Sequence, residues 1–595
     1  MPRPFRGKGR SDLDKRRLNL MKVALGQVPP DTVIENGVLV DVATRRLVDG
    51  IYISISEERI ASISREKPKT DSKTKIIDAN GAYLAPGLVD AHYHIESSRL
   101  SPRRHAQITL PHGTTTLFEG SHEICNPLGL DGIRYLLEEA EGLPQKIFIG
   151  LSSATPPTPY ETTGSYIGGK EAEEALRLRG VSGIDEVMDY TALFGGEERL
   201  HSVIEAGLSS GKVVEGHGVP SPPQADALFA TGVSSTHFSG DSAKAIALLE
   251  RGCFLELKPR DSRQAIHELV TTNIDWQMVG MCVDDRPAES INQLGHLDYE
   301  LRICIEEGLD PITAIQIATL NNARHWRKEH EVGIVAPGRR ADIIFLTDLE
   351  SFKIDRVMAD GEIVAEKGKL TVNIPIMPAP DYVLNTIRLQ KHLTSKDFEV
   401  RSPNNQSKVK AAVLRPFYFS VDLLPITREL QVEDGLVQRD LSHEVNKVAI
   451  IRRDGGGLGI SFWELGYQYG AIAMSVLHDS HNISVIGAND ADMARAVNRV
   501  AEMGGGIVVV KSGIIKADVP LPIAGLMTDK PLSEVVAGLD KVNEEAAKLV
   551  PGKLLGPNPV DTQTFIFLTC FPWSIVLTDK GLVNVRTGQW LPPVW

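Results

Sequence analysis

Two closely spaced histidines are the strongest chemical signal in the sequence. His92 and His94 lie two residues apart in the segment GLVDAHYHIESS, residues 87–98, at the end of an apolar run. Alternate side chains of an extended strand point to the same face, so both imidazoles would share one side. Two neutral imidazoles near a strand end suit a transition metal. A pair of hydrogen-bonded core histidines has the same spacing, so the pair alone leaves both interpretations open.

Four further side chains that ligate metals follow other short β-forming runs. They are Glu186 in GIDEVMDY, His217 in VVEGHG, His237 in VSSTHF and Asp284 in MCVDDR. A carboxylate buried among histidines is costly without a cation, and a bound metal removes that cost. Six ligands exceed the need of one ion with an open position, so we expect two ions bridged by a carboxylate. The predicted ligands are His92, His94, Glu186, His217, His237 and Asp284.

The elements around these residues indicate how they come together. Eight short apolar runs alternate with amphipathic helical segments between residues 86 and 330. Alternating strands and helices imply a parallel sheet with right-handed crossovers, and eight repeats predict a (β/α)8 TIM-like barrel. Active sites of such barrels lie at the carboxyl ends of the strands. The runs are Leu88–His94, Thr115–Glu119, Lys146–Ser152, Gly183–Val187, Lys212–Glu215, Gly232–Thr236, Cys253–Leu257 and Met278–Asp284.

The segments that flank the barrel predict an α/β chain of several domains. Residues 31–85 and 331–385 have alternating strand patterns, so we expect the barrel, residues 86–330, to be inserted into a small β-sandwich domain. Residues 1–30 form a basic N-terminal extension with a helix near residues 11–25, and residues 395–595 form a C-terminal α+β domain.

Charge and cysteine content exclude several classes of protein. The net charge of −13 disfavours a nucleic-acid partner, and the longest apolar runs are too short for a membrane span. The five cysteines are widely spaced and form no CxxC motif, which disfavours a disulfide framework or a thiolate metal site. No apolar segment typical of a signal peptide follows the basic start. We therefore expect a cytoplasmic protein.

The motifs resemble those of bacterial adenine deaminases in the amidohydrolase superfamily. The superfamily resemblance covers residues 31–370, including APGLVDAH and GIVAPGRRADIIFL, and a glutamate at position 186 stands where many members have a carboxylated lysine. The narrower resemblance spans all three domains. It is carried by DAHYHIESSRLSP, HEICNPLG, VMDY, DDR, GHLD, LPIAGLM and AIAMSVLHDSHN.

This resemblance implies a hydrolase of purine metabolism that acts on a C–N bond of a cyclic amidine. The expected reaction converts adenine and water to hypoxanthine and ammonia through a metal-activated hydroxide. The expected cofactors are two divalent ions, Mn or Fe before Zn, with no other cofactor-binding residues. The expected partners are a small-molecule purine and a second copy of the chain, as a homodimer.

The resemblance also implies catalytic roles for three residues. Asp284 would accept a proton from the attacking water, Glu123 would protonate a ring nitrogen, and His122 would position or polarise a reacting group. Glu123 could equally be an exposed carboxylate at a helix start, where the helix dipole favours negative charge.

Departures from the family pattern leave the substrate open. Gly120 replaces an aspartate, with Glu119 a candidate to compensate, Phe238 replaces a glutamate, and Lys258–Asp261 replaces Arg-Glu-Gly-Ser. The alternative is an amidohydrolase acting on an N6-substituted adenine or a cyclic amide, and a third option is a non-catalytic scaffold. His478 and His481 could bind metal, reach the active site across a domain interface, or stabilise a turn.

Overall fold

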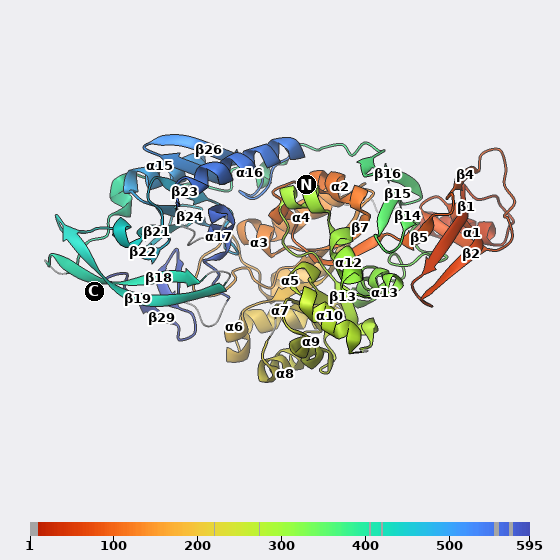
Figure 1. Cartoon of the computed structure of the whole chain (residues 1–595), viewed down its shortest axis with the longest axis horizontal. Coiled ribbons are helices and arrows are strands. Elements are labelled where there is room, and N and C mark those ends of the chain that lie inside the picture. Colours follow the sequence, from red (N-terminus) through yellow and green to blue (C-terminus); the bar gives the residue numbers. More distant parts are fainter. Residues whose placement is uncertain are drawn as a thin grey trace.

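The computed structural model describes residues 10–218, 220–272, 274–403, 406–417, 420–551, 558–570 and 575–595. Figure 1 shows three parts along the long axis: an N-terminal sheet, a central barrel and a C-terminal sheet domain. The prediction of a mixed α/β chain with a barrel and a separate C-terminal domain is confirmed. Within the described part of the chain, no helix has both the length and the apolar character needed to cross a membrane.

The central part is a parallel barrel of eight strands in chain order. An isolated parallel bridge between Tyr93 and Asp284 connects β6, the first strand, to the segment that follows β13, the last strand. In this bridge the Asp284 amide donates to the His92 carbonyl at 3.0 Å. The strands are β6 (Leu88–Tyr93), β7 (Thr114–Gly120), β8 (Lys146–Leu151), β9 (Val181–Val187), β10 (Val213–Gly216), β11 (Ser235–Phe238), β12 (Phe254–Leu257) and β13 (Val279–Met281).

The strands agree with the predicted runs to within two residues at most ends, but the start of the sixth and the end of the eighth each differ by three residues. The sixth begins at Ser235 rather than Gly232, because Gly232 has a φ of +96° in the turn that precedes it. The eighth ends at Met281, and Asp284 has a φ of +59°, which no extended strand permits.

The barrel segment contains helices α2 (Pro102–Thr109), α3 (His122–Leu128), α4 (Leu130–Ala140), α5 (Gly169–Leu176), α6 (Tyr190–Gly195), α7 (Glu198–Ser209), α8 (Pro222–Ala230), α9 (Ser242–Leu249), α10 (Arg263–Thr271), α11 (Ala288–Leu294), α12 (Leu297–Glu306), α13 (Pro311–Ile317) and α14 (Leu320–His325).

A sheet of nine strands combines the segments before and after the barrel. β5 pairs antiparallel with β14, so the barrel is an insertion between two halves of one sheet. Helix α1 (Arg10–Ala24) lies against β2 and β3. The strands are β1 (Thr32–Asp41), β2 (Arg46–Ser56), β3 (Arg59–Ser64), β4 (Lys75–Asp78), β5 (Tyr83–Pro86), β14 (Ile343–Asp348), β15 (Lys353–Ala359), β16 (Glu362–Glu366) and β17 (Lys369–Leu370).

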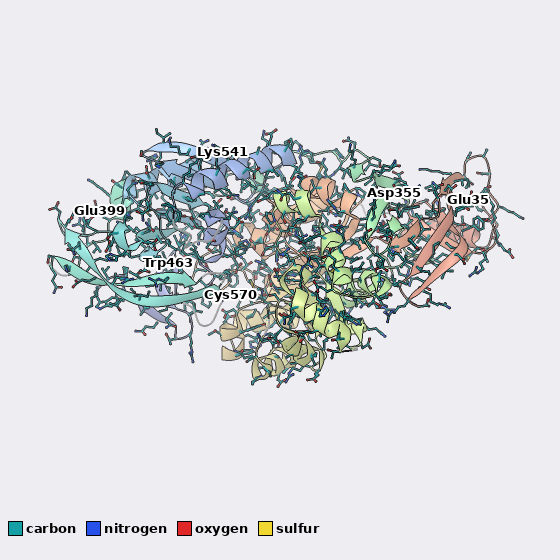
Figure 2. The ribbon with its side chains drawn as sticks, viewed as in Figure 1. Glu35, Asp355, Glu399, Trp463, Lys541 and Cys570 are labelled. Carbon is teal, nitrogen blue, oxygen red and sulfur yellow. The ribbon has the colours of Figure 1, made fainter. Side chains whose placement is uncertain are left out.

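The C-terminal domain is built on a second sheet of nine strands, with a three-stranded sheet beside it. Figure 2 shows Trp463 within this domain and Cys570 at its boundary with the barrel, where Cys570 packs with Ala154 and Met188. The helices are α15 (Asp490–Glu502), α16 (Leu532–Ala547) and α17 (Pro559–Phe565). The strands are β18 (Lys408–Phe417), β19 (Ser420–Glu433), β20 (Leu436–Val437), β21 (Val445–Ile451), β22 (Leu458–Glu464), β23 (Ala471–Met474), β24 (Ile483–Gly487), β25 (Gly506–Lys511), β26 (Ile514–Pro520), β27 (Ile575–Thr578), β28 (Gly581–Asn584) and β29 (Gln589–Leu591).

Candidate active site and metal centre

The two histidines at the end of β6 face each other in the barrel. Both are buried, and their Nε2 atoms lie 3.0 Å apart. The other ring nitrogens have partners on the barrel wall: Nδ1 of His94 lies 2.8 Å from the Gly120 carbonyl, and Nδ1 of His92 lies 3.4 Å from a Glu215 oxygen. Such partners orient an imidazole so that its second nitrogen is available to a metal. A hydrogen bond between the two Nε2 atoms also agrees with a pair of core histidines, so the neighbouring carboxylates must distinguish the two interpretations.

Glu186, at the end of β9, lies between two groups of histidines. Its Oε1 is 3.8 Å from Nε2 of His92 and 3.5 Å from Nε2 of His94. Its Oε2 is 3.4 Å from Nε2 of His237 and contacts Nδ1 of His217. Burial would raise the pKa of Glu186, but the charges of His217 and His237 outweigh it and hold that pKa well below its usual range. Each carboxylate oxygen thus faces its own group of nitrogens.

Asp284 completes the group around the first two histidines. Its Oδ1 lies 3.4 Å from Nε2 of His94 and 3.8 Å from Nε2 of His92. Its Oδ2 lies 2.5 Å from Nζ of Lys258, a residue in the loop that departs from the family pattern. No local pattern in the sequence predicts this ion pair, because only the pairing of β12 with β13 brings the two residues together.

The donor set fits divalent transition metals. His92, His94 and Glu186 offer ligand atoms that all lie within 4.8 Å of one another, and so do Glu186, His217 and His237. Imidazole and carboxylate donors suit Mn, Fe and Zn, and the carboxylates are too buried to remain uncompensated. The structure therefore brings together the six predicted ligands: two groups share Glu186, and Asp284 lies beside His92 and His94.

A second layer of buried groups supports the His92 side of this site. Glu215 contacts His92 through one oxygen, and its other oxygen lies 3.3 Å from Nε2 of His325. Burial and the neighbouring Glu256 raise the pKa of Glu215 well above its usual range. Glu215 could have been predicted from the sequence to lie near the site, because it stands two residues before His217 and alternate residues of a strand share a face.

His122 and Glu123 begin helix α3, directly after β7. Nδ1 of His122 lies 3.0 Å from Oδ2 of Asp185, and its Nε2 lies 3.0 Å from Oε1 of Glu123. Glu123 is only 1% exposed, so the interpretation as an exposed helix-start carboxylate is wrong. Burial would raise the pKa of Glu123, but His478 and His481 outweigh it, and the pKa lies well below its usual range.

Asp185 occupies the space beside Gly120, where the family pattern has an aspartate. A Cβ atom at Gly120 would lie 2.5 Å from Cε1 of His94 and 2.7 Å from Oδ1 of Asp185, so a side chain at position 120 would require both of these side chains to shift. Glu119, the residue expected to compensate, instead accepts hydrogen bonds from the Ile95 amide at 3.0 and 3.2 Å. That expectation is wrong because neighbouring residues of a strand point to opposite faces.

Two histidines of the C-terminal domain complete this corner of the site. Nδ1 of His478 lies 2.5 Å from Oε1 of Glu123, and Nε2 of His481 contacts Oε2 of the same carboxylate. Both imidazoles are buried. Of the three interpretations that the segment HDSHN left open, the structure supports the one in which these residues reach the active site across a domain interface.

Comparisons with known proteins cover nearly the whole chain. The amidohydrolase family model matches residues 83–364, and the model of the adenine deaminase C-terminal domain matches residues 425–589. An adenine deaminase of Moorella thermoacetica is 37% identical over 95% of this chain and 96% of its own length. One of Clostridium botulinum (strain ATCC 19397 / Type A) is 35% identical over 96% of each chain. A solved structure of molinate hydrolase is 16% identical, with a TM-score of 0.45, over 59% of this chain and 98% of that chain.

Proposed function

This chain belongs to the adenine deaminase family of the amidohydrolase superfamily, and we propose that it converts adenine and water to hypoxanthine and ammonia. It is a hydrolase that acts on a C–N bond. Relatives named adenine deaminase match it over both the barrel and the C-terminal domain. The observation that carries the proposal is the position of Glu186 between two groups of histidines, next to the buried pair His122 and Glu123.

Membership of the superfamily implies divalent metal binding, and two ions fit the six ligands at the strand ends. His92, His94 and Asp284 would hold one ion, His217 and His237 the other, and Glu186 would bridge them. We propose Mn or Fe, with Zn as a third choice, because imidazole suits Fe and Zn and carboxylate suits Mn. Bound divalent ions lower the pKa of water so that hydroxide is available near neutral pH.

Asp284 is suited to accept the proton of the attacking water. Burial would raise its pKa, but Lys258 and then His237 outweigh burial and hold the pKa of Asp284 well below its usual range. The carboxylate is therefore ionised before the reaction, with Oδ1 directed toward the histidines and Oδ2 held by Lys258. It would pass the proton to the exocyclic nitrogen, which leaves as ammonia.

Glu123 is suited to move a proton to the purine ring. Its low pKa means that it is ionised at rest, so it would first take the Nε2 proton of His122, whose pKa lies well above its usual range. The hydroxyl of the tetrahedral carbon would return a proton to this pair as ammonia leaves and the carbonyl of hypoxanthine forms. The ring nitrogen next to the attacked carbon must gain a proton as that carbon becomes tetrahedral. His122, whose Nδ1 is paired with Asp185 and whose Nε2 contacts Glu123, holds that carboxylate next to the metal ligands.

A panel of substrates tests this proposal. Metal-loaded protein would be incubated with adenine, adenosine, N6-methyladenine and a cyclic amide such as dihydrouracil, and released ammonia or amine would be measured. We expect adenine to react fastest, and adenosine more slowly because the family acts on free bases. Faster turnover of adenosine, or turnover of the cyclic amide alone, would contradict the proposal.

We also propose a cytoplasmic homodimer. Superfamily membership supports the dimer, and five buried cysteines without a disulfide agree with a reducing compartment. Light scattering coupled to size-exclusion chromatography would measure the mass, and a monomer at micromolar concentration would contradict the dimer.

A further inference from the structure

The loop His478–His481 connects β23 and β24 of the C-terminal sheet and ends inside the barrel site. His478 is 4% exposed and His481 has no exposed surface. Their imidazoles contact different oxygens of one carboxylate, Glu123, which is 1% exposed. Glu123 belongs to the catalytic barrel, whereas both histidines lie more than 350 residues further along the chain.

The loop is held in place from both sides of the domain boundary. His481 adopts a φ of +51°, an uncommon conformation for a residue with a side chain. Its amide donates to the Leu477 carbonyl at 2.8 Å, and its carbonyl accepts from buried Arg453 at 3.2 Å. The next residue, Asn482, donates to the barrel carbonyl of Thr162 at 2.8 Å. These contacts fix the backbone of His481 and with it the direction of its imidazole.

Further contacts set the position of the C-terminal domain relative to the barrel. The Ser101 amide donates to the Thr528 carbonyl at 2.9 Å, and Arg104 donates to the Asp529 carbonyl at 2.8 Å. On another side of the interface, the Thr162 amide donates to Asp579 at 2.9 Å. The two histidines that approach Glu123 therefore belong to a domain that is hydrogen-bonded to the barrel at several points.

A carboxylate as buried as Glu123 needs partners for both oxygens. His122 lies 3.0 Å from Oε1 but leaves Oε2 without a barrel partner among the described contacts. His478 and His481 approach the two oxygens from the opposite side as ion pairs rather than as hydrogen-bond donors, since Oε1 of Glu123 and Nε2 of His481 have no hydrogen-bond partner among the described residues. Burial would lower the pKa of His478, but Glu123 outweighs it and raises that pKa to about 10, so His478 is a cation beside the carboxylate.

We propose that His478 and His481 are positioning residues that orient Glu123 for proton transfer to the purine, so that the C-terminal domain completes the active site. This inference rests on the proposed deaminase function and on the role of Glu123 in it. It gives the C-terminal domain a role in catalysis. The barrel supplies the proposed metal ligands, and the C-terminal domain supplies the two histidines that contact the proton-transferring carboxylate of Glu123.

A further metal site is the competing explanation for the same residues. Ligand atoms of His122, Glu123, His478 and Asp479 all lie within 4.8 Å of one another. The six residues at the strand ends already supply ligands for two ions, so we favour direct pairing of imidazole and carboxylate at Glu123. The metal content of the variants decides between the two explanations.

Substitutions that keep or remove the donor nitrogen test the proposal in the full-length, metal-loaded protein. His478→Asn keeps a nitrogen near the position of Nδ1, and His481→Gln keeps one near Nε2, whereas His478→Leu and His481→Leu keep none. We expect kcat to fall about 10²-fold in each leucine variant, with a much smaller change in KM, because a misoriented proton donor slows chemistry rather than binding. The amide variants should recover most of kcat. His443→Leu, at an exposed histidine of the same domain, is the matched control.

Double variants that combine each leucine substitution with Glu123→Gln test whether the histidines act on kcat through Glu123. If the histidines act through Glu123, the leucine substitutions should cost little further activity once Glu123 is gone. Leucine variants with native kcat, or losses that multiply with that of Glu123→Gln, would overturn the proposal. Loss of a bound ion in His478→Leu would replace it with the metal site. Each variant's kcat is compared with that of the wild type on the purine that the wild type turns over best. Failure to react with adenine would therefore contradict the proposed substrate and not the role of the two histidines.

Discussion

The ammonium of Lys258 lies 2.5 Å from Oδ2 of Asp284. Lys258 follows β12 and Asp284 follows β13, so the pair joins neighbouring strand ends at the rim of the barrel. The Lys258 side chain is 15% exposed and that of Asp284 9%. Because Lys258 holds one oxygen, only Oδ1 of Asp284 faces the histidines, and the carboxylate is both ionised and oriented before substrate arrives.

The Lys258–Asp284 pair should matter most to the metal-free protein. Without ions, Lys258→Met leaves Asp284 with histidines alone for compensation, and the loss of one partner of a buried pair costs on the order of 3 kcal/mol. Bound ions would replace the lost charge, so we expect a smaller drop in Tm for the loaded variant. Calorimetry of both forms measures this, with Lys170→Met at an exposed position as control. Equal drops in Tm with and without metal would contradict the expectation.

Asp284 and Glu186 should respond differently to loss of charge. Asp284→Asn keeps the shape and one oxygen ligand but cannot accept a proton, so we expect kcat to fall at least about 10²-fold with most metal retained. Glu186→Gln weakens the carboxylate that both histidine groups share, so it should lose metal as well as rate. Steady-state kinetics and elemental analysis of the same samples compare the two. Near-native turnover of Asp284→Asn with full metal content would show that Asp284 is not the proton acceptor.

Metal loading should follow the arrangement of the two ligand groups. Protein purified without chelator should contain about two transition ions per chain, because Glu186 offers one oxygen to each group. Chelation should abolish turnover, and added Mn or Fe should restore it as the second equivalent binds. Inductively coupled plasma mass spectrometry measures the ratio. A ratio that stays at one after reconstitution with excess ion, with full activity, would contradict a two-ion centre.

Glu161 should make stability depend on pH at the domain boundary. Burial raises its pKa to about 8, although hydrogen bonds from Thr569 and Ser480 oppose the shift. Between the unfolded pKa of about 4.3 and the folded value, the folded state binds more protons, so this carboxyl lowers the free energy of unfolding as pH rises. Glu161→Gln should therefore stabilise the protein more at pH 8 than at pH 5.5. Thermal unfolding across this range tests it, with exposed Glu198→Gln as control. A pH-independent difference from wild type would contradict it.

The barrel and the convergence of the six proposed metal ligands could be predicted from sequence because both depend on local periodicity. Each strand of a parallel barrel runs in the same direction, so the residues that follow the apolar runs converge on one rim. His92 and His94, two residues apart, share a face for the same reason. This local pattern was sufficient to select six residues that the structure brings together at one rim, even where the sixth and eighth strands begin or end at other residues than expected.

The surroundings of those ligands were decided only by the tertiary structure. Asp185 takes the space beside Gly120, Lys258 pairs with Asp284, and His478 and His481 reach Glu123 from another domain. Each of these contacts joins residues far apart in the chain, and each depends on how whole strands and domains pack. Strand and helix periodicity places a side chain on a face of its own element, but it carries no information about which distant element covers that face.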